Sequence, residues 1–180
     1  MIAEAAWQEF SLRKVLFIPS GDTPNKDMHH IDKNIRYAMV EKAIEGNGHF
    51  MISPIERDRQ GPSYTVDTIR ILQREFGDDY EFYFICGTDA VADLPTWKYN
   101  RELLSACHFI CASRPGNEIE IQKSIDYFGE LGRKKIHFLK TPELAISSTI
   151  LRDWIAEKRS VRYLIPDAVI DMIRSKKLYE

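Results

Sequence analysis

The chain has 180 residues, of which 44% are hydrophobic and 29% are charged, so it can bury a sizeable core. This composition excludes disordered and fibrous proteins, and a net charge of -2 provides no overall basic field for nucleic acid. No apolar run approaches the roughly 20 residues that a membrane span needs, and no basic leader precedes a short apolar core. We therefore expect one soluble domain over residues 1–180, with no nucleic-acid or membrane partner.

Three cysteines, Cys86, Cys107 and Cys111, lie inside apolar runs and lack the paired spacing of a zinc site or a disulfide framework. Thiols in such positions are typical of reduced core residues. Because disulfides are rare in the cytoplasm, this pattern predicts a cytoplasmic protein.

The first residues, 2–10, place apolar side chains at helical spacing, and residues 14–19 follow as an apolar strand of the kind buried on both faces of a parallel sheet. A parallel strand that follows a helix implies an earlier strand, because the crossover unit is strand, helix, strand. No such strand precedes residue 2 in this sequence. The pattern therefore predicts a sheet from which the first strand is missing.

A loop of turn-forming residues, 20–26, follows this strand on the side where open α/β sheets bind ligands, and Lys26 is a candidate binding residue there. The next histidines, His29 and His30, do not predict a metal site. Adjacent residues cannot share a helix face, and no carboxylate cluster accompanies them. Residues 34–45 then predict a helix.

A second strand is expected at residues 49–55 and a third at residues 80–86. The helix between them begins at Ser63 or Thr65, either of which can cap it. Its inner, apolar face consists of Val66, Ile69, Leu72 and Phe76. The first turn of this helix offers free backbone amides, to which an anion can bind.

The third strand ends in Gly87, where the missing side chain lets a ligand approach the backbone, and the carboxylate of Asp89 can hold a ribose hydroxyl. After a short helical run, Trp97 lies in a loop behind Pro95 and beside Lys98. The alternative for Trp97 is a core aromatic, since tryptophan is usually mostly buried. Its loop position favours an exposed, flat stacking surface.

Residues 106–112 predict a fourth strand, in which His108 is a packed histidine rather than a catalyst. Arg114 follows this strand and places a fixed cation where it can meet phosphate. Residues 117–132 predict a peripheral helix, and residues 136–139 predict the last strand.

The stretch 146–152 begins the next helix, and Ser148, Thr149 and Arg152 share its polar side. Free amides of the first turn, two hydroxyls and a guanidinium converge there, an arrangement that favours a phosphate. The alternative is that Ser147 or Ser148 simply caps a surface helix whose arginine is solvated.

A closing helix is expected after Pro166, with Val169, Met172 and Ile173 directed inward. Strands thus alternate with helices, which predicts a parallel, doubly wound α/β sheet in one domain. The polar loops described above all follow strands, so they meet at one edge of that sheet. This shared edge favours the phosphate-binding interpretation of residues 146–152.

Five segments, in this order and spacing, resemble bacterial nicotinate-nucleotide adenylyltransferases: PSGDTPNK, GPSYTVDT, CGTDAVADLPTWK, SRPG and ISSTILR. The resemblance covers essentially the whole chain and implies a Rossmann-like nucleotidyltransferase fold. It also implies a reaction in which ATP and nicotinate mononucleotide give nicotinate adenine dinucleotide and pyrophosphate, with Mg²⁺, in NAD biosynthesis. Such chemistry requires alignment and charge neutralisation rather than a covalent nucleophile.

On the acceptor side, the resemblance implies that Tyr64 and Thr65 hold the pyridine carboxylate, partly through backbone amides. Trp97 would stack on the pyridine ring. Lys26 and Lys98 would lie near the acceptor's phosphate and ribose.

On the ATP side, the resemblance implies that Gly87 and Asp89 bind the nucleotide, with Asp89 on the ribose hydroxyls. The residues that would bind the phosphates are Arg114, Ser147, Ser148, Thr149 and Arg152. Of these, Ser148, Thr149 and Arg152 would be catalytic.

The family opens with a strand and a loop of the form GGTFDPxHxGH, whose two histidines stabilise the triphosphate, and this sequence lacks that segment. This strand is the central one of the usual 3-2-1-4-5 order, so we expect a shortened member of the family in which two strands lack a neighbour. Because the two histidines are missing as well, we expect turnover to be severely weakened. Two alternatives remain: a related adenylyltransferase that uses nicotinamide mononucleotide or pantetheine phosphate, or a catalytically inactive nucleotide-binding module.

Overall fold

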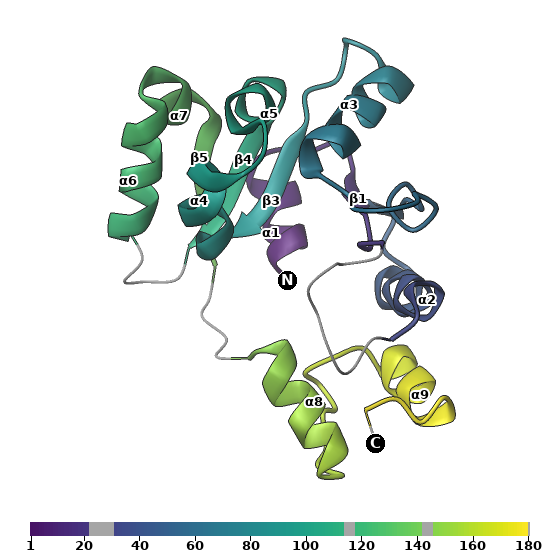
Figure 1. Cartoon of the computed structure of the whole chain (residues 1–180). Helices are drawn as coiled ribbons and strands as arrows, with labels where there is room; N and C mark the ends of the chain where they lie inside the picture. The colour runs from purple at the N-terminus through teal and green to yellow at the C-terminus, as the bar shows by residue number, and fades with distance from the viewer. Residues whose placement is uncertain (22–30, 114–117, 142–145, 180) are drawn as a thin grey trace. The chain divides into compact units, whose positions relative to one another are not determined.

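A computed structural model describes residues 1–21, 31–113, 118–141 and 146–179 of the chain (Figure 1). Its contacts divide the chain into two compact units. Unit 1 comprises Met1–Arg13 and Tyr64–Glu143, and unit 2 comprises Lys14–Ser63 and Leu144–Glu180. The expected single domain over residues 1–180 stays a prediction, and each unit is described by itself below.

Unit 1 is built on a parallel sheet in the order β3-β4-β5. These strands are β3 (Tyr83–Gly87), β4 (His108–Ser113) and β5 (Ile136–Lys140). In the register, Tyr83 lies opposite His108, and Phe109 lies opposite Ile136. The parallel pairing confirms the predicted α/β class, because each connection between neighbouring strands passes through helices.

Helix α1 (Ile2–Glu9) covers one face of this sheet, where its buried Ala6 packs against Ile110 and Leu139. On the opposite side of the sheet, Figure 1 shows further helices. They are α4 (Thr88–Asp93), α5 (Asn100–Ala106), α6 (Glu118–Phe128) and α7 (Glu130–Lys135), with a 3₁₀ turn at Leu94–Thr96. Both faces of the sheet are therefore covered, as its continuous apolar strands require.

Helix α3 (Thr65–Phe76) buries Val66, Ile69 and Leu72 as predicted. Two expectations for this helix are wrong. It begins at Thr65, one of the two predicted starts, but neither Ser63 nor Thr65 caps it, because the N-cap is Tyr64, whose backbone is extended. Phe76 is 40% exposed because it is the last residue of the helix, where it contacts the rings of Tyr80 and Phe82 instead of the inner face.

The helix predicted at residues 117–132 is two helices, α6 and α7. Gly129 separates them with a φ of 63°, a left-handed conformation that ends a helix at little cost for glycine. The predicted inner face of α6 is confirmed, since Ile121, Ile125 and Phe128 are buried.

Unit 2 contains a two-stranded parallel sheet formed by β1 (Val15–Phe17) and β2 (Phe50–Ile52). Its helices are α2 (Lys33–Ile44), α8 (Ser148–Ala156) and α9 (Asp167–Ser175). In α9, Val169 and Ile173 are buried as predicted. Ile170 takes the buried position expected for Met172, which is only half-buried.

Within the described ranges, β1 pairs only with β2, and the β3 edge of the other sheet pairs only with β4. This agrees with the expectation that two strands lack a neighbour. None of the helices in these ranges is long and apolar enough to span a membrane.

Candidate functional site

The first turn of α8 holds the phosphate-binding candidates. Ser147 is the N-cap, and its Oγ accepts a hydrogen bond from the Ile150 amide at 3.1 Å. The capping alternative is therefore confirmed for Ser147, whose Oγ serves its own helix as an acceptor. The amides of Ser148 and Thr149 have no acceptor among the described residues, so both are free donors at the start of the helix.

The side chain of Arg152 reaches the first turn of α8, where its Nη2 donates a hydrogen bond to the Thr149 Oγ1 at 3.2 Å. The Ser148 and Thr149 side chains are exposed, and Arg152 is half-buried. A guanidinium, free amides and the positive end of the helix dipole thus lie within one turn of each other. This is the chemistry that binds phosphate.

In unit 1, Gly87 ends β3 and caps α4. A Cβ added at Gly87 would meet nothing within 4 Å, so the space in front of this backbone is open. Asp89 is exposed in the first turn of α4. Its negative charge adds to burial in raising the pKa of Cys111 to about 11.

Trp97 follows the 3₁₀ turn and is half-buried, which lies between the exposed stacking surface that its loop position favoured and the alternative of a core aromatic. Its ring makes edge contacts with Phe84, at 6.1 Å between centroids, and with Phe109, at 6.5 Å. The loop around it is fixed by a hydrogen bond from the Asn100 Nδ2 to the Pro95 carbonyl at 2.6 Å. Core packing therefore holds part of the Trp97 ring in place while part of it remains accessible.

Tyr64 and Lys98 lie together beside the start of α3. The Lys98 Nζ is 4.6 Å from the centroid of the Tyr64 ring. Thr65 is the first helical residue, and the amides of Thr65 and Val66 have no acceptor among the residues that the structure describes. The structure thus groups a cation, an aromatic ring and free amides at the residues for which the resemblance implies binding of the pyridine carboxylate.

Sequence reasoning missed several neighbours of this group. Tyr99 has a left-handed backbone, and its ring also approaches Lys98. Arg70 pairs with Asp67 on its own helix, α3, and joins α3 to α5 through Glu102. The spacing of three residues between Asp67 and Arg70 was a usable signal for that ion pair, but the partner on α5 is distant in sequence.

A second omission lies in the charged loop 56–62. The Nη1 and Nη2 of Arg59 and the Oγ of Ser63 are shielded from solvent and have no hydrogen-bond partner within the described ranges. Buried polar atoms usually have partners. The sequence identified this loop as charged but gave no reason to single out Arg59.

Two predicted site residues, Lys26 and Arg114, lie outside the described residues, as do His29 and His30. The part of the chain that is described contains no group of three or more His, Cys, Asp or Glu side chains that could hold a metal ion.

The cysteines are free thiols, as expected from their apolar surroundings. Burial raises the pKa of Cys86 and of Cys107 to about 12. These thiols stay protonated near neutral pH, which makes them poor nucleophiles.

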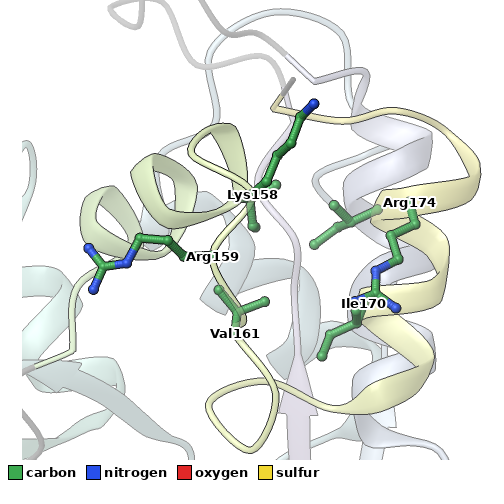
Figure 2. A pocket seen from close by; sticks show the side chains of 7 residues that line it. Lys158, Arg159, Val161, Ile170 and Arg174 are labelled. Carbon is green, nitrogen blue, oxygen red and sulfur yellow. The ribbon is translucent and has the colours of Figure 1, made fainter.

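Unit 2 also contains a hollow of about 270 Å³ between the end of α8 and α9 (Figure 2). Its lining combines aliphatic and cationic side chains, namely Ile155, Lys158, Arg159, Val161, Ile170, Ile173 and Arg174. The side chains of Lys158 and Arg159 extend away from its centre in Figure 2. None of the predicted site residues lines this hollow, and it lies at the end of α8 opposite to Ser148 and Thr149.

Comparisons with known proteins show the family to which this chain belongs. The family profile described as cytidylyltransferase-like matches residues 1–153. The chain is 44% identical over 179 residues to the probable nicotinate-nucleotide adenylyltransferase of Moorella thermoacetica, covering 98% of this chain and 82% of that protein. It is 41% identical over 180 residues to the protein of the same name from Thermoanaerobacter sp. strain X514, covering 99% and 85%.

Among solved structures, the Plasmodium falciparum nicotinic acid mononucleotide adenylyltransferase complexed with NaAD matches with a TM-score of 0.73. The sequence identity is 19%, and the match covers 99% of this chain and 90% of that one. At this identity, the match establishes a shared fold.

Proposed function

Because this chain belongs to the cytidylyltransferase-like family, we propose that it transfers the adenylyl group of ATP to nicotinate mononucleotide in NAD biosynthesis. A 5′-phosphate oxygen of the mononucleotide attacks the α-phosphorus of ATP, the bond from that phosphorus to the bridging oxygen breaks, and pyrophosphate leaves. The products are nicotinate adenine dinucleotide and pyrophosphate. The observation that carries this proposal is the first turn of α8, where free amides lie beside the Thr149–Arg152 pair.

In this proposal, the ATP phosphates bind at the start of α8. The amides of Ser148 and Thr149 and the guanidinium of Arg152 neutralise the charge that builds up on the leaving pyrophosphate. Ser147 supports them by capping the helix. Mg²⁺ enters with ATP as part of the substrate, which suits an ion that keeps its waters and binds through substrate phosphates.

The acceptor binds at the start of α3. Free amides of Thr65 and Val66 and the nearby Lys98 favour a carboxylate, and the accessible part of Trp97 stacks on the pyridine ring. Tyr64 borders the same place. We assign Lys26 to the acceptor phosphate from the sequence alone.

The nucleoside part of ATP binds at the end of β3. The open space before Gly87 admits the ligand, and the exposed Asp89 accepts hydrogen bonds from the ribose hydroxyls. We assign Arg114 to the phosphates from its place in the sequence.

A panel of acceptors tests the function. Pyrophosphate release is measured with ATP and Mg²⁺ and with nicotinate mononucleotide, nicotinamide mononucleotide or pantetheine phosphate in separate reactions. We expect the fastest release with nicotinate mononucleotide. Faster release with either other acceptor would contradict the assignment in favour of a related adenylyltransferase, whereas dinucleotide binding without any release would establish a binding module.

We also infer a cytoplasmic location, which the free cysteines support. Fractionation of the source cells should recover the protein with cytoplasmic markers. Recovery with secreted or membrane fractions would contradict this location.

A further inference from the structure

The ammonium of Lys98 lies between two tyrosine rings in unit 1. Its Nζ is 4.6 Å from the centroid of Tyr64 and 5.2 Å from the centroid of Tyr99. Both rings are substantially exposed, at 42% for Tyr64 and 53% for Tyr99. Lys98 forms no ion pair within the described ranges. The rings therefore hold a cation that pairs directly with no carboxylate of the described chain.

Tyr99 adopts a backbone conformation that tyrosine disfavours. Its φ of 56° and ψ of 35° lie in the left-handed region, although its structural task there is only to begin α5. Its carbonyl accepts from the Leu103 amide at 2.9 Å, and its side chain makes no capping hydrogen bond. Glycine could provide this backbone at lower cost, so the ring of Tyr99 needs a role of its own.

A second cation also approaches the Tyr99 ring. The Arg70 Cζ is 5.4 Å from the ring centroid. Arg70 is itself anchored, because its Nε and Nη2 donate to one oxygen of Glu102 and its Nη1 donates to Asp67 at 2.8 Å. Both carboxylates pair with Arg70 and neither pairs with Lys98, so Lys98 is the cation of this cluster that has no ion-pair partner among the described residues.

The Lys98 ammonium lies beside the start of α3. Tyr64, whose ring contacts the Lys98 ammonium, is the N-cap of that helix. The free amides of Thr65 and Val66 and the helix dipole give the same place a positive potential. A fixed cation there favours a ligand with a carboxylate over the corresponding neutral amide.

We propose that Tyr99 is a positioning residue that sets acceptor selectivity: by holding Lys98 against Tyr64, it fixes a positive charge that favours an acidic pyridine mononucleotide over its amide. This inference rests on the proposed function, since it assumes that the pyridine group binds at the start of α3. Tyr99 itself touches Lys98 and acts through it.

The test compares the dissociation constants of nicotinate and nicotinamide mononucleotide, measured by calorimetry. Tyr99→Gly removes the ring and relieves the left-handed strain, so its thermal midpoint should not fall. We expect it to raise the dissociation constant of the acid about fivefold and to leave that of the amide unchanged, as for the loss of one exposed cation–π contact near a helix end.

Four further variants, one of them a control, isolate the mechanism. Tyr99→Phe keeps the ring and should retain the wild-type preference. Lys98→Met should lose the preference, and adding Tyr99→Gly to it should cause no further loss. Tyr127→Gly is the matched control, because Tyr127 is a 52% exposed tyrosine beside Arg101 in the same unit, and it should not change the preference.

The proposal is overturned if Tyr99→Gly leaves the ratio of the two dissociation constants unchanged, or if it weakens both ligands equally, as a merely structural role would. Failure of the proposed function gives a different result. In that case the wild-type chain itself binds neither mononucleotide, or binds the amide more tightly, and the inference about Tyr99 falls with it.

Discussion

Gly87 is the site residue whose role can be tested without disturbing the fold. Its φ is negative and a Cβ would meet only open space, so Gly87→Ala should leave the thermal midpoint unchanged. We expect it to raise the dissociation constant of ATP about tenfold, because the added methyl group occupies space that the nucleotide needs, and such crowding typically costs about 1–3 kcal/mol. Calorimetric titration with ATP measures the effect.

The matched control is Gly48→Ala, where a Cβ would also meet only open space. This variant should bind ATP like the wild type. Equal ATP binding by Gly87→Ala and Gly48→Ala would contradict the placement of the nucleotide at the end of β3.

A histidine pair at the other end of the sheet makes stability depend on pH. The His108 Nδ1 and His137 Nε2 are 2.8 Å apart, and the Lys135 Nζ is 3.0 Å from the His108 Nε2. Burial and the charge of Lys135 lower the pKa of both histidines, although Glu81 opposes this for His108. When the Lys135 ammonium donates to the His108 Nε2, the proton of a neutral His108 ring is on Nδ1, which donates to the Nε2 of a neutral His137 ring. Both histidines are therefore packed residues, as the sequence predicted for His108.

The sign of the pH effect follows from these lowered pKa values. As the pH falls below about 6.5, the histidines of the unfolded chain take up protons before those of the folded chain do. Their contribution to the free energy of unfolding is therefore fully present above that pH and is lost below it. We expect the urea midpoint to fall between about pH 7.5 and about pH 5.5, and this fall should shrink in His137→Gln. An equal fall in both proteins would contradict the role of the pair.

Some single residues were predictable because their surroundings are local. Ser147 caps α8 through the amide of Ile150, three residues away, and a serine before an apolar run is the ordinary signal for this. Trp97 was harder, because its partners Phe84 and Phe109 come from two different strands. No local pattern reports such contacts, so the sequence left the burial of Trp97 open.

At the scale of elements, α8 ends in a Schellman motif built on an unfavourable residue. The Lys158 amide donates to the Ile155 carbonyl, the Arg159 amide donates to the Trp154 carbonyl, and Lys158 has a φ of 59°. Glycine is preferred at this position. We expect Lys158→Gly to stabilise the protein by about 0.5–1 kcal/mol and to raise the thermal midpoint by about 1–3 °C.

Lys158→Ala separates backbone strain from charge in this prediction. Alanine removes the same charge but keeps a side chain in the left-handed region, so it should give no such increase. Equal increases in Lys158→Gly and Lys158→Ala would show that the charge, and not the backbone, limits stability here.

The order of helices and strands follows from hydrophobic periodicity, but element ends depend on contacts that periodicity does not encode. The apolar spacing of residues 117–132 continues past Gly129, so the pattern alone gave no reason to divide α6 from α7. Likewise, Ser63 and Thr65 are both better capping residues than Tyr64. Tyr64 is the N-cap of α3 because its backbone is still extended while its carbonyl already accepts from the amides of Asp67 and Thr68.

At the scale of the whole molecule, topological rules predicted the parallel pairing that both sheets show, whereas the common edge expected for the polar loops stays a prediction. They also predicted that two strands would lack a neighbour, and within the described ranges β1 pairs only with β2 and β3 pairs only with β4. The division into two units was not predictable from local patterns. Each unit joins segments far apart in sequence, such as Met1–Arg13 with Tyr64–Glu143.

The central claim is that this chain recognises both halves of nicotinate adenine dinucleotide, and equilibrium binding of that product tests it most directly because no turnover is required. We predict saturable binding by calorimetry. Arg152→Ala should raise the dissociation constant at least about tenfold through loss of a charge-assisted contact to phosphate. Arg159→Ala, which removes an arginine from the opposite end of α8, should leave it unchanged. Absence of saturable binding, or equal effects of the two substitutions, would contradict the account.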